Sequence, residues 1–141
     1  MATINVYADG VYDLLHPGHL AFLSKAKALG DRLLVGVHND EDVATYKHQP
    51  VIEHRHRVEM LEACRLVDKV IPNAPLCTDE AYLKLHQIDL VVHGDDTAFE
   101  TYYAVPLALG IMRYVPYTQE ISTTLIQQRV IERHLETRSA P

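Results

Sequence analysis

The chain has 141 residues, of which 48% are hydrophobic and 23% are charged, so its size fits one domain and its composition argues against a disordered protein. Its net charge is -6 and no basic stretch is long enough to follow a phosphate backbone, which argues against nucleic acid as a partner. No apolar run reaches the roughly 18–20 residues of a membrane helix, no signal peptide is recognisable, and only two cysteines occur, so we expect a cytoplasmic protein.

Strand and helix patterns alternate along the chain. In chain order, they predict a strand at 4–7, a helix at 16–29, a strand at 33–37, a polar loop at 38–50, a helix at 58–66, a strand at 70–71, a helix at 80–85, a strand at 89–93, a partly helical segment at 98–110, a strand at 112–115 and a helix at 122–135. This alternation favours parallel pairing with right-handed crossovers, and so a Rossmann-like α/β sheet flanked by helices.

A parallel sheet of this kind binds ligands beyond the carboxyl ends of its strands. The residues that follow the predicted strands are therefore expected to surround one cleft. We expect one domain over residues 1–136 and a linker-like tail at 137–141, and the tail is compatible with a further domain beyond Pro141.

The tetrapeptide His16-Pro17-Gly18-His19 stands where a strand and turn lead into a helix. The free N–H groups and the positive end of a helix bind phosphates, and histidines three residues apart lie on one helical turn. Their imidazole N–H groups are suited to stabilising charge on a transferring phosphoryl group. Two chance surface histidines, or half of a zinc site, remain alternative interpretations of the pair.

Residues 7–19, YADGVYDLLHPGH, resemble the opening of the cytidylyltransferase family within the HxGH nucleotidyltransferase superfamily. Ile121-Ser122-Thr123-Thr124 matches the second signature of that family, and residues 65–70, 73–75 and 93–96 look like intervening segments of its ethanolamine- and choline-phosphate enzymes. The resemblance covers roughly residues 4–133 in the family's order. It also extends to related cytidylyltransferase domains of phosphonate pathways, and it implies a fold of nucleotidyltransferase type.

The resemblance implies an enzyme that transfers CMP from CTP to a small phosphate- or phosphonate-bearing alcohol and releases pyrophosphate. It implies Mg²⁺ carried mainly by the CTP phosphates, with no certain metal ligand on the protein, and a homodimer. The catalytic residues that it implies are His16, His19, Lys47 and Thr123.

The same resemblance implies two binding sets. The nucleotide-binding set is Ala8, Asp9, Gly10, Val11, Tyr12, Gly18, His93, Gly94, Asp95, Ser122, Thr123 and Thr124. The acceptor-binding set is Asp13, Lys47, Arg57 and Leu76. For four of these residues the ordinary structural alternatives stay open: Asp13 as a turn cap, Ser122 as a helix N-cap, Lys47 as a solvated loop residue, and Asp95 as a turn-forming aspartate. Arg65 and Asp68 are assigned to a dimer interface or to the structure of the domain.

The chain departs from the family pattern at two places. Residues 117–120 are Tyr-Thr-Gln-Glu where the family has Arg-Thr-Glu-Gly, and Arg113 is the nearest candidate to replace that arginine. Leu76 replaces an aromatic residue of the choline and ethanolamine enzymes, which counts against phosphocholine because quaternary ammonium groups favour aromatic cages. Tyr102 and Tyr103 are other sources of rings, although the pattern favours packed or rim positions for both. The acceptors considered are phosphoethanolamine, glycerol 3-phosphate and, as a serious candidate, 2-hydroxyethylphosphonate.

Three other functions compete with this interpretation. A metal-binding protein would use His16, His19 and further histidines such as His54 and His56, although the alternation of those two suits a strand or loop. A nucleotide-binding module without catalysis is compatible with the altered residues 117–120. An adenylyltransferase shares the histidine motif, and a comparison of CTP with ATP separates the two.

Overall fold

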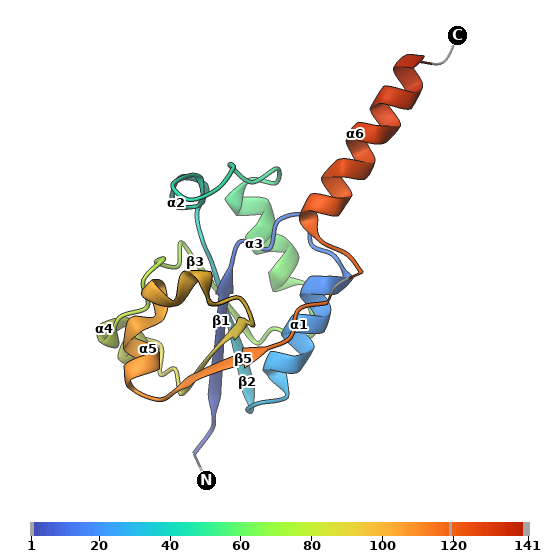
Figure 1. The fold of residues 1–141 in the computed structure, drawn as a ribbon. Helices are drawn as coiled ribbons and strands as arrows, with labels where there is room; N and C mark the ends of the chain where they lie inside the picture. The colour runs from blue at the N-terminus through green and yellow to red at the C-terminus, as the bar shows by residue number, and fades with distance from the viewer. Residues whose placement is uncertain (1, 119, 140–141) are drawn as a thin grey trace.

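A computed structural model describes residues 2–118 and 120–139 of the chain (Figure 1). Its elements in chain order are β1 (Asn5–Gly10), α1 (Pro17–Lys27), β2 (Arg32–Val37), α2 (Asp40–Ala44), α3 (His54–Glu62), β3 (Lys69–Pro72), α4 (Glu80–Leu85), β4 (Leu90–Gly94), the 3₁₀ segment η1 (Thr97–Tyr103), α5 (Ala104–Ala108), β5 (Met112–Val115) and α6 (Thr123–Ser139). The predicted Rossmann-like α/β fold is confirmed.

The five strands form one parallel sheet in the order β3-β2-β1-β4-β5. The order reverses beside β1, because β2 and β3 lie on one side of it and β4 and β5 on the other. β1 pairs with β2 along its whole length, but it pairs with β4 only at Val6 and Tyr7. The carboxyl ends of β1 and β4 therefore separate, which opens a crevice at the point where such sheets bind ligands.

Helices cover both faces of the sheet, so the strands are apolar on both sides. One core cluster joins Val6 and Ala8 to residues of α1 and α3, such as Leu23 and Leu61. Tyr7, which points to the opposite face, belongs to a second cluster with residues of α4, β4 and η1. Because this core anchors β1 on both faces, the loop that follows the strand starts from a fixed position.

Three predicted element boundaries are wrong. The polar loop at 38–50 contains α2, whose first turn is capped by Asn39 through a hydrogen bond from the Asp42 N–H, 2.7 Å. α3 begins at His54, four residues before its first predicted apolar residue, so His54 and His56 lie on a helix and not on a strand or loop. α6 continues to Ser139, so the part of the predicted tail at 137–139 is helical, and residues 140–141 lie outside the described residues.

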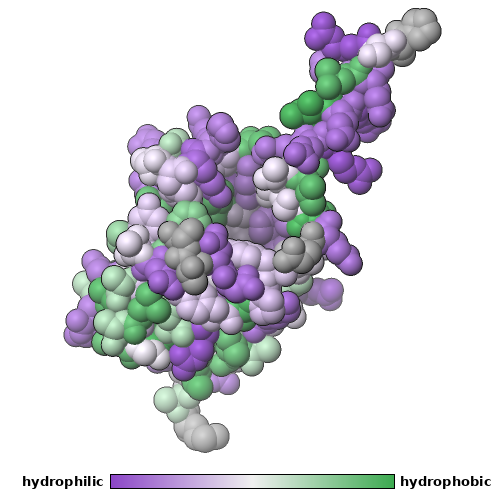
Figure 2. Space-filling view, viewed as in Figure 1, coloured by the Kyte–Doolittle hydropathy of each residue, from purple (hydrophilic) through white to green (hydrophobic). Residues whose placement is uncertain are grey.

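α6 extends away from the sheet (Figure 1), and none of its described residues is buried. Figure 2 shows apolar side chains on one side of it, among polar ones. Only the start of α6, as far as Gln127, therefore lines the cleft. Within residues 2–118 and 120–139, no helix combines the length and the apolar character that a membrane span requires.

Candidate active site

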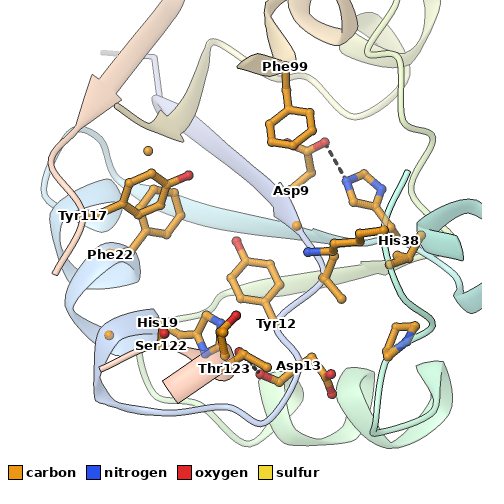
Figure 3. Close-up of a pocket in the computed structure, with 18 of the residues that line it drawn as sticks. Asp9, Tyr12, Asp13, His19, Phe22, His38, Phe99, Tyr117, Ser122 and Thr123 are labelled. Atoms are coloured by element: carbon orange, nitrogen blue, oxygen red, sulfur yellow. Dashed lines mark hydrogen bonds and ion pairs between the residues drawn. The ribbon is translucent and has the colours of Figure 1, made fainter. Parts of the chain in front are cut away.

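A cavity of about 810 Å³ lies at the carboxyl edge of the sheet. Its walls come from the ends of β1, β2 and β4, the start of α1, the loop after α2, and the segment that leads into α6 (Figure 3). The residues after four different strands thus meet around one cleft, as the sheet topology predicts.

His16 and His19 line this cavity and also cap the helix that carries them. The Gly18 N–H donates to His16 Nδ1 at 3.0 Å, and the His16 N–H donates to His19 Nδ1 at 3.2 Å. Because Nδ1 accepts a hydrogen bond in both rings, each neutral imidazole carries its proton on Nε2. Each ring therefore offers an Nε2–H donor in an orientation that the helix start fixes.

Both rings are neutral at pH 7. Burial lowers the pKa of His16. The pKa of His19 is lowered to about 4, mainly by burial and also by the nearby His16 and Lys47, while the charge of Asp13 acts in the opposite direction. The ring centroids lie 3.9 Å apart, a spacing at which two imidazolium ions would repel each other strongly. The pair is therefore a neutral hydrogen-bond donor, strengthened by the helix N-terminus.

Gly18 is required by the position of the His16 ring. A Cβ atom on Gly18 would lie 2.7 Å from Cε1 of that ring, 2.9 Å from its Nδ1 and 3.2 Å from the carbonyl oxygen of Ile121. The absence of a side chain thus lets the imidazole pack against the helix backbone. It also lets the segment before α6 approach α1.

The start of α6 faces the cavity with free backbone donors. Ser122 Oγ accepts the N–H of Leu125 at 3.1 Å, so Ser122 forms the N-cap contact. The Thr123 hydroxyl donates to the carbonyl oxygen of Asp13 at 2.8 Å, which ties α6 to the loop after β1. Among the described residues, the N–H groups of Thr123 and Thr124 have no acceptor, and both residues line the cavity. These groups can bind an anion.

Lys47 lines the cavity from the loop after α2. The pKa of Lys47 is lowered, mainly by burial and also by the charge of Arg57, and the charge of Asp13 opposes this change. Its ammonium group lies 5.6 Å from the centre of the Tyr46 ring. The Asp13 carboxylate accepts the N–H groups of Val51 at 2.8 Å and Ile52 at 2.9 Å. Asp13 thus anchors the far end of the loop that carries Lys47, in agreement with the capping alternative.

Three predicted site residues do not line the cavity. Arg57 is only 1% exposed and its guanidinium bonds acceptors inside the protein, so its predicted contact with the acceptor phosphate is wrong. The Ala8 side chain is fully buried in the core, because it points into the sheet face under α1. Asp95 is exposed beyond the end of β4.

Arg113 does not take the place of the family arginine. Its guanidinium donates to the carbonyl oxygens of Gly110 and Met112 at 3.1 and 2.9 Å, away from the cavity. Tyr117 lies over Gly94 instead, since a Cβ atom on Gly94 would come within 2.0 Å of Cζ in the Tyr117 ring. The residue that replaces the arginine is therefore an aromatic wall at the end of β4.

A buried polar group lies at the ends of β1 and β2, and it includes His38, which sequence analysis missed. The Tyr103 hydroxyl donates to Asp9 Oδ1 at 2.8 Å, and His38 Nε2 lies 3.1 Å from Asp9 Oδ2 (Figure 3). His38 Nδ1 contacts the carbonyl oxygen of Ala74 at 3.0 Å. Because both ring nitrogens face oxygen acceptors, these contacts favour the protonated form of His38. His38 directly follows the buried strand β2, and a polar residue at that position was the signal in the sequence that would have identified it.

The pKa of His38 is raised by these contacts. Burial by itself lowers it, but the hydrogen bond and the charge of Asp9 outweigh burial, and the Ala74 carbonyl adds to them. Asp9, predicted to bind the nucleotide, thus presents a carboxylate whose charge is partly balanced at the floor of the cavity.

Aromatic rings gather beside this buried group. The ring centroids of Tyr46 and Phe99 lie 5.6 Å apart, and those of Tyr46 and Tyr102 lie 6.2 Å apart. All three residues line the cavity with Leu76. The rings that Leu76 does not supply therefore come from other elements, among them Tyr46 and Phe99, which sequence analysis did not consider.

Comparison with known proteins matches residues 7–129 to the family described as Cytidylyltransferase-like. An ethanolamine-phosphate cytidylyltransferase of Mus musculus is 40% identical over 133 residues, which are 91% of this chain and 33% of that protein. A choline-phosphate cytidylyltransferase A of Rattus norvegicus is 34% identical over 134 residues, 91% of this chain and 36% of that protein. The chain thus spans roughly a third of the length of these relatives.

Among solved structures, a lipopolysaccharide core biosynthesis protein from Thermoplasma volcanium GSS1 has the same fold. The two structures align with a TM-score of 0.69 and 26% identity, over 85% of this chain and all of that one. The similarity in sequence and the similarity in fold therefore extend over the sheet and the cavity alike.

Proposed function

This chain belongs to the cytidylyltransferase-like family, and from that premise we propose that it transfers CMP from CTP to phosphoethanolamine and releases pyrophosphate. One observation carries the proposal. Two neutral imidazoles offer Nε2–H groups at the start of α1, in a cavity where the free N–H groups of α6 lie on the same wall. Such a constellation is suited to a triphosphate, since its donors are arranged before the substrate arrives.

The reaction needs no general base, because the acceptor phosphate is already an oxyanion. One of its oxygens attacks the α-phosphorus of CTP, a new P–O bond forms, and the bond from that phosphorus to the pyrophosphate oxygen breaks. His16 and His19 donate hydrogen bonds to the oxygens on which negative charge develops. Lys47 reduces the repulsion between the two anions, and the N–H groups of Thr123 and Thr124 hold the departing pyrophosphate.

Mg²⁺ is proposed as a metal that the triphosphate brings with it. Within the described residues, no group of three or more His, Cys, Asp or Glu side chains is able to hold a metal ion, and both Asp13 carboxylate oxygens accept backbone N–H groups. The phosphate oxygens must then supply most of the ligands, and the ion supplies charge neutralisation. The same observation gives no support to a metal-binding protein.

The preference for phosphoethanolamine rests on the end of the cavity at Asp9. Aromatic rings gather there, and their faces favour a cationic head group, which phosphoethanolamine has and 2-hydroxyethylphosphonate lacks. The Asp9 carboxylate beside them is buried and paired with His38, so the preference comes from the rings. The relatives named above act on ethanolamine phosphate and choline phosphate, which points in the same direction. 2-Hydroxyethylphosphonate is a serious candidate from the sequence because Leu76 is apolar and the family arginine is missing. Tyr46, Phe99 and Tyr102 bring rings to the same cavity, which supports phosphoethanolamine over it.

A homodimer and a reducing compartment remain predictions from the family resemblance and from the cysteine count. Cys64 and Cys77 are free thiols in the structure. Asp68, assigned to an interface or to the fold, pairs with Lys27 and accepts the N–H of Leu33, which supports a structural role.

The test measures pyrophosphate release with CTP and, in turn, phosphoethanolamine, phosphocholine, glycerol 3-phosphate and 2-hydroxyethylphosphonate. We expect the highest kcat/KM with phosphoethanolamine, and the His19→Ala variant serves as the control that excludes a contaminating enzyme. A higher value with the phosphonate would overturn the acceptor assignment, and no release with any acceptor would overturn the activity.

A further inference from the structure

Arg57 connects four segments that surround the active-site cavity. Its Nε donates to the carbonyl oxygen of Ile52 at 2.8 Å, and its Nη1 donates to the carbonyl oxygens of Val11 at 2.7 Å and His38 at 2.9 Å. Its Nη2 donates to Asp40 Oδ1 at 2.6 Å. These acceptors belong to the loop after β1, the end of β2, the start of α2 and the loop before α3.

Two of these segments are the ends of the loop that carries Lys47. At the first end, Asp40 is the first residue of α2, which leads into the loop, and its Oδ2 also accepts the N–H of His54 at 3.2 Å. At the second end, the N–H of Ile52 donates to the Asp13 carboxylate, and the carbonyl oxygen of Ile52 accepts a hydrogen bond from Arg57. Within the described residues, by contrast, no hydrogen bond holds the main chain of residues 48–50.

The same contacts relate this loop to the histidines. Arg57 bonds Val11, and Asp13 lies three residues before His16, so the segment that leads into α1 is fixed by the two side chains that fix the loop. The position of Lys47 relative to His16 and His19 is thereby set through side chains that do not contact the substrate. Burial of the guanidinium strengthens these hydrogen bonds, since water does not compete for them.

We propose that Arg57 is a positioning residue, which fixes both ends of the Lys47 loop relative to the histidine pair. This proposal rests on the proposed function, in which Lys47 acts on the phosphates. A lysine at position 57 cannot bridge four acceptors, because a single ammonium group lacks the planar fork of a guanidinium. Arg57→Lys therefore displaces Lys47, and a displacement of about 1 Å costs on the order of 10²-fold in rate.

The test is a double-mutant cycle on kcat with Arg57→Lys and Lys47→Ala. We expect Arg57→Lys to lower kcat by about 10-fold to 100-fold in the wild type, with a much smaller change in the KM for CTP. In the Lys47→Ala background the same change should lower kcat by less than about twofold, because the two effects are not independent. Equal losses in both backgrounds would overturn the proposal. Arg55→Lys is the matched control, since Arg55 lies on the same helix with its side chain 74% exposed.

A second measurement does not depend on turnover. The rate at which an amine-reactive ester acylates Lys47 is compared with the rate at Lys84, whose side chain is 77% exposed. Arg57→Lys should increase the relative rate at Lys47 several-fold, and an unchanged rate would contradict the proposal even if the wild type showed no activity. An inactive wild type would overturn the proposed function alone. Should Arg57→Lys fail to fold, Asp40→Ala removes one anchor of the same loop and should act in the same direction.

Discussion

His16 has two separable tasks in this structure. Its Nδ1 caps the start of α1, and its Nε2–H is left as a donor for a ligand in the cavity that His16 lines. A side chain that caps equally well but ends sooner would preserve the first task and remove the second. Asparagine is such a residue, because it is among the preferred N-caps and is shorter than histidine.

His16→Asn should therefore leave the melting temperature close to that of the wild type and lower kcat by on the order of 10²–10³, as the removal of a preorganised donor does. Calorimetry and initial rates measure the two quantities. His19→Ala is expected to lose a similar factor in kcat. Near-wild-type turnover in either variant would mean that the ring does not act on the transferring phosphoryl group.

The Asp9–His38 pair predicts a dependence of stability on pH with a definite sign. Burial lowers the pKa of His38, but the hydrogen bond and charge of Asp9 raise it by more than burial lowers it. The folded pKa therefore lies above the ordinary 6.5. The contribution of His38 is then complete below pH 6.5 and is lost as the pH rises through the folded pKa. Urea unfolding of wild type and His38→Gln from pH 6 to pH 9 should show the largest difference in free energy at the acidic end. A difference that does not vary with pH would show that His38 is not an imidazolium.

At the level of elements, α6 is attached to the domain by its first turn. Its described residues are not buried, and the Thr123 hydroxyl bonds the Asp13 carbonyl. Thr123→Val keeps the shape of the side chain but removes this bond, at a cost of about 1 kcal/mol in stability. We expect a higher KM for CTP, because the N–H groups at the start of α6 lose their fixed position. Steady-state kinetics would check this.

Thr137→Val is the matched control for that change. Thr137 lies on the same helix, and its hydroxyl donates to the carbonyl oxygen of Arg133 at 2.9 Å, far along the chain from the cavity. The KM for CTP should not change in this variant. An equal increase in both variants would indicate a general effect on the helix rather than a contact at the cavity.

The elements with apolar patterns could be predicted from the sequence, and those held by tertiary contacts could not. The segments 80–85 and 112–115 have the predicted bounds: Met112 and Val115 of the strand face the core, and Leu83 is the buried residue of the helix. α2 also has one buried residue, Val43, but it lies in a run of polar residues and depends on Asn39 and on the pairing of Asp40 with Arg57. Short helices of this kind have no periodic pattern to detect.

The residues of the candidate site divide in the same way, into those that a local motif identifies and those that depend on tertiary contacts. The histidine pair and the start of α6 could be located because their roles depend on local helix geometry, which a motif encodes. Arg57 was named from the sequence, but its role could not be predicted, since its acceptors come from four segments that only the folded chain brings together. Tyr46 and Phe99 were missed for a similar reason, because they come together from the loop after α2 and from η1.

The whole molecule carries a net charge of -6, yet its proposed substrates are anions. The attraction must therefore be local, from the helix ends and Lys47 at one cavity whose walls belong to β1, β2, β4, α1 and α6. A nucleotide bound there joins the sheet and α1 to α6, none of whose described residues is buried. Ligand binding to the folded state alone stabilises it, by about 2.7 kcal/mol at a concentration one hundred times the Kd.

CTP should accordingly raise the melting temperature of the protein by several degrees, and by more than ATP at the same concentration, if the cavity selects a cytosine base. Differential scanning fluorimetry with both nucleotides, at one Mg²⁺ concentration, measures this. Gly18→Ala is the informative variant, because its Cβ atom would displace the His16 ring and should abolish most of the shift. A larger shift with ATP would favour an adenylyltransferase, and equal shifts would indicate a site that binds triphosphates without reading the base.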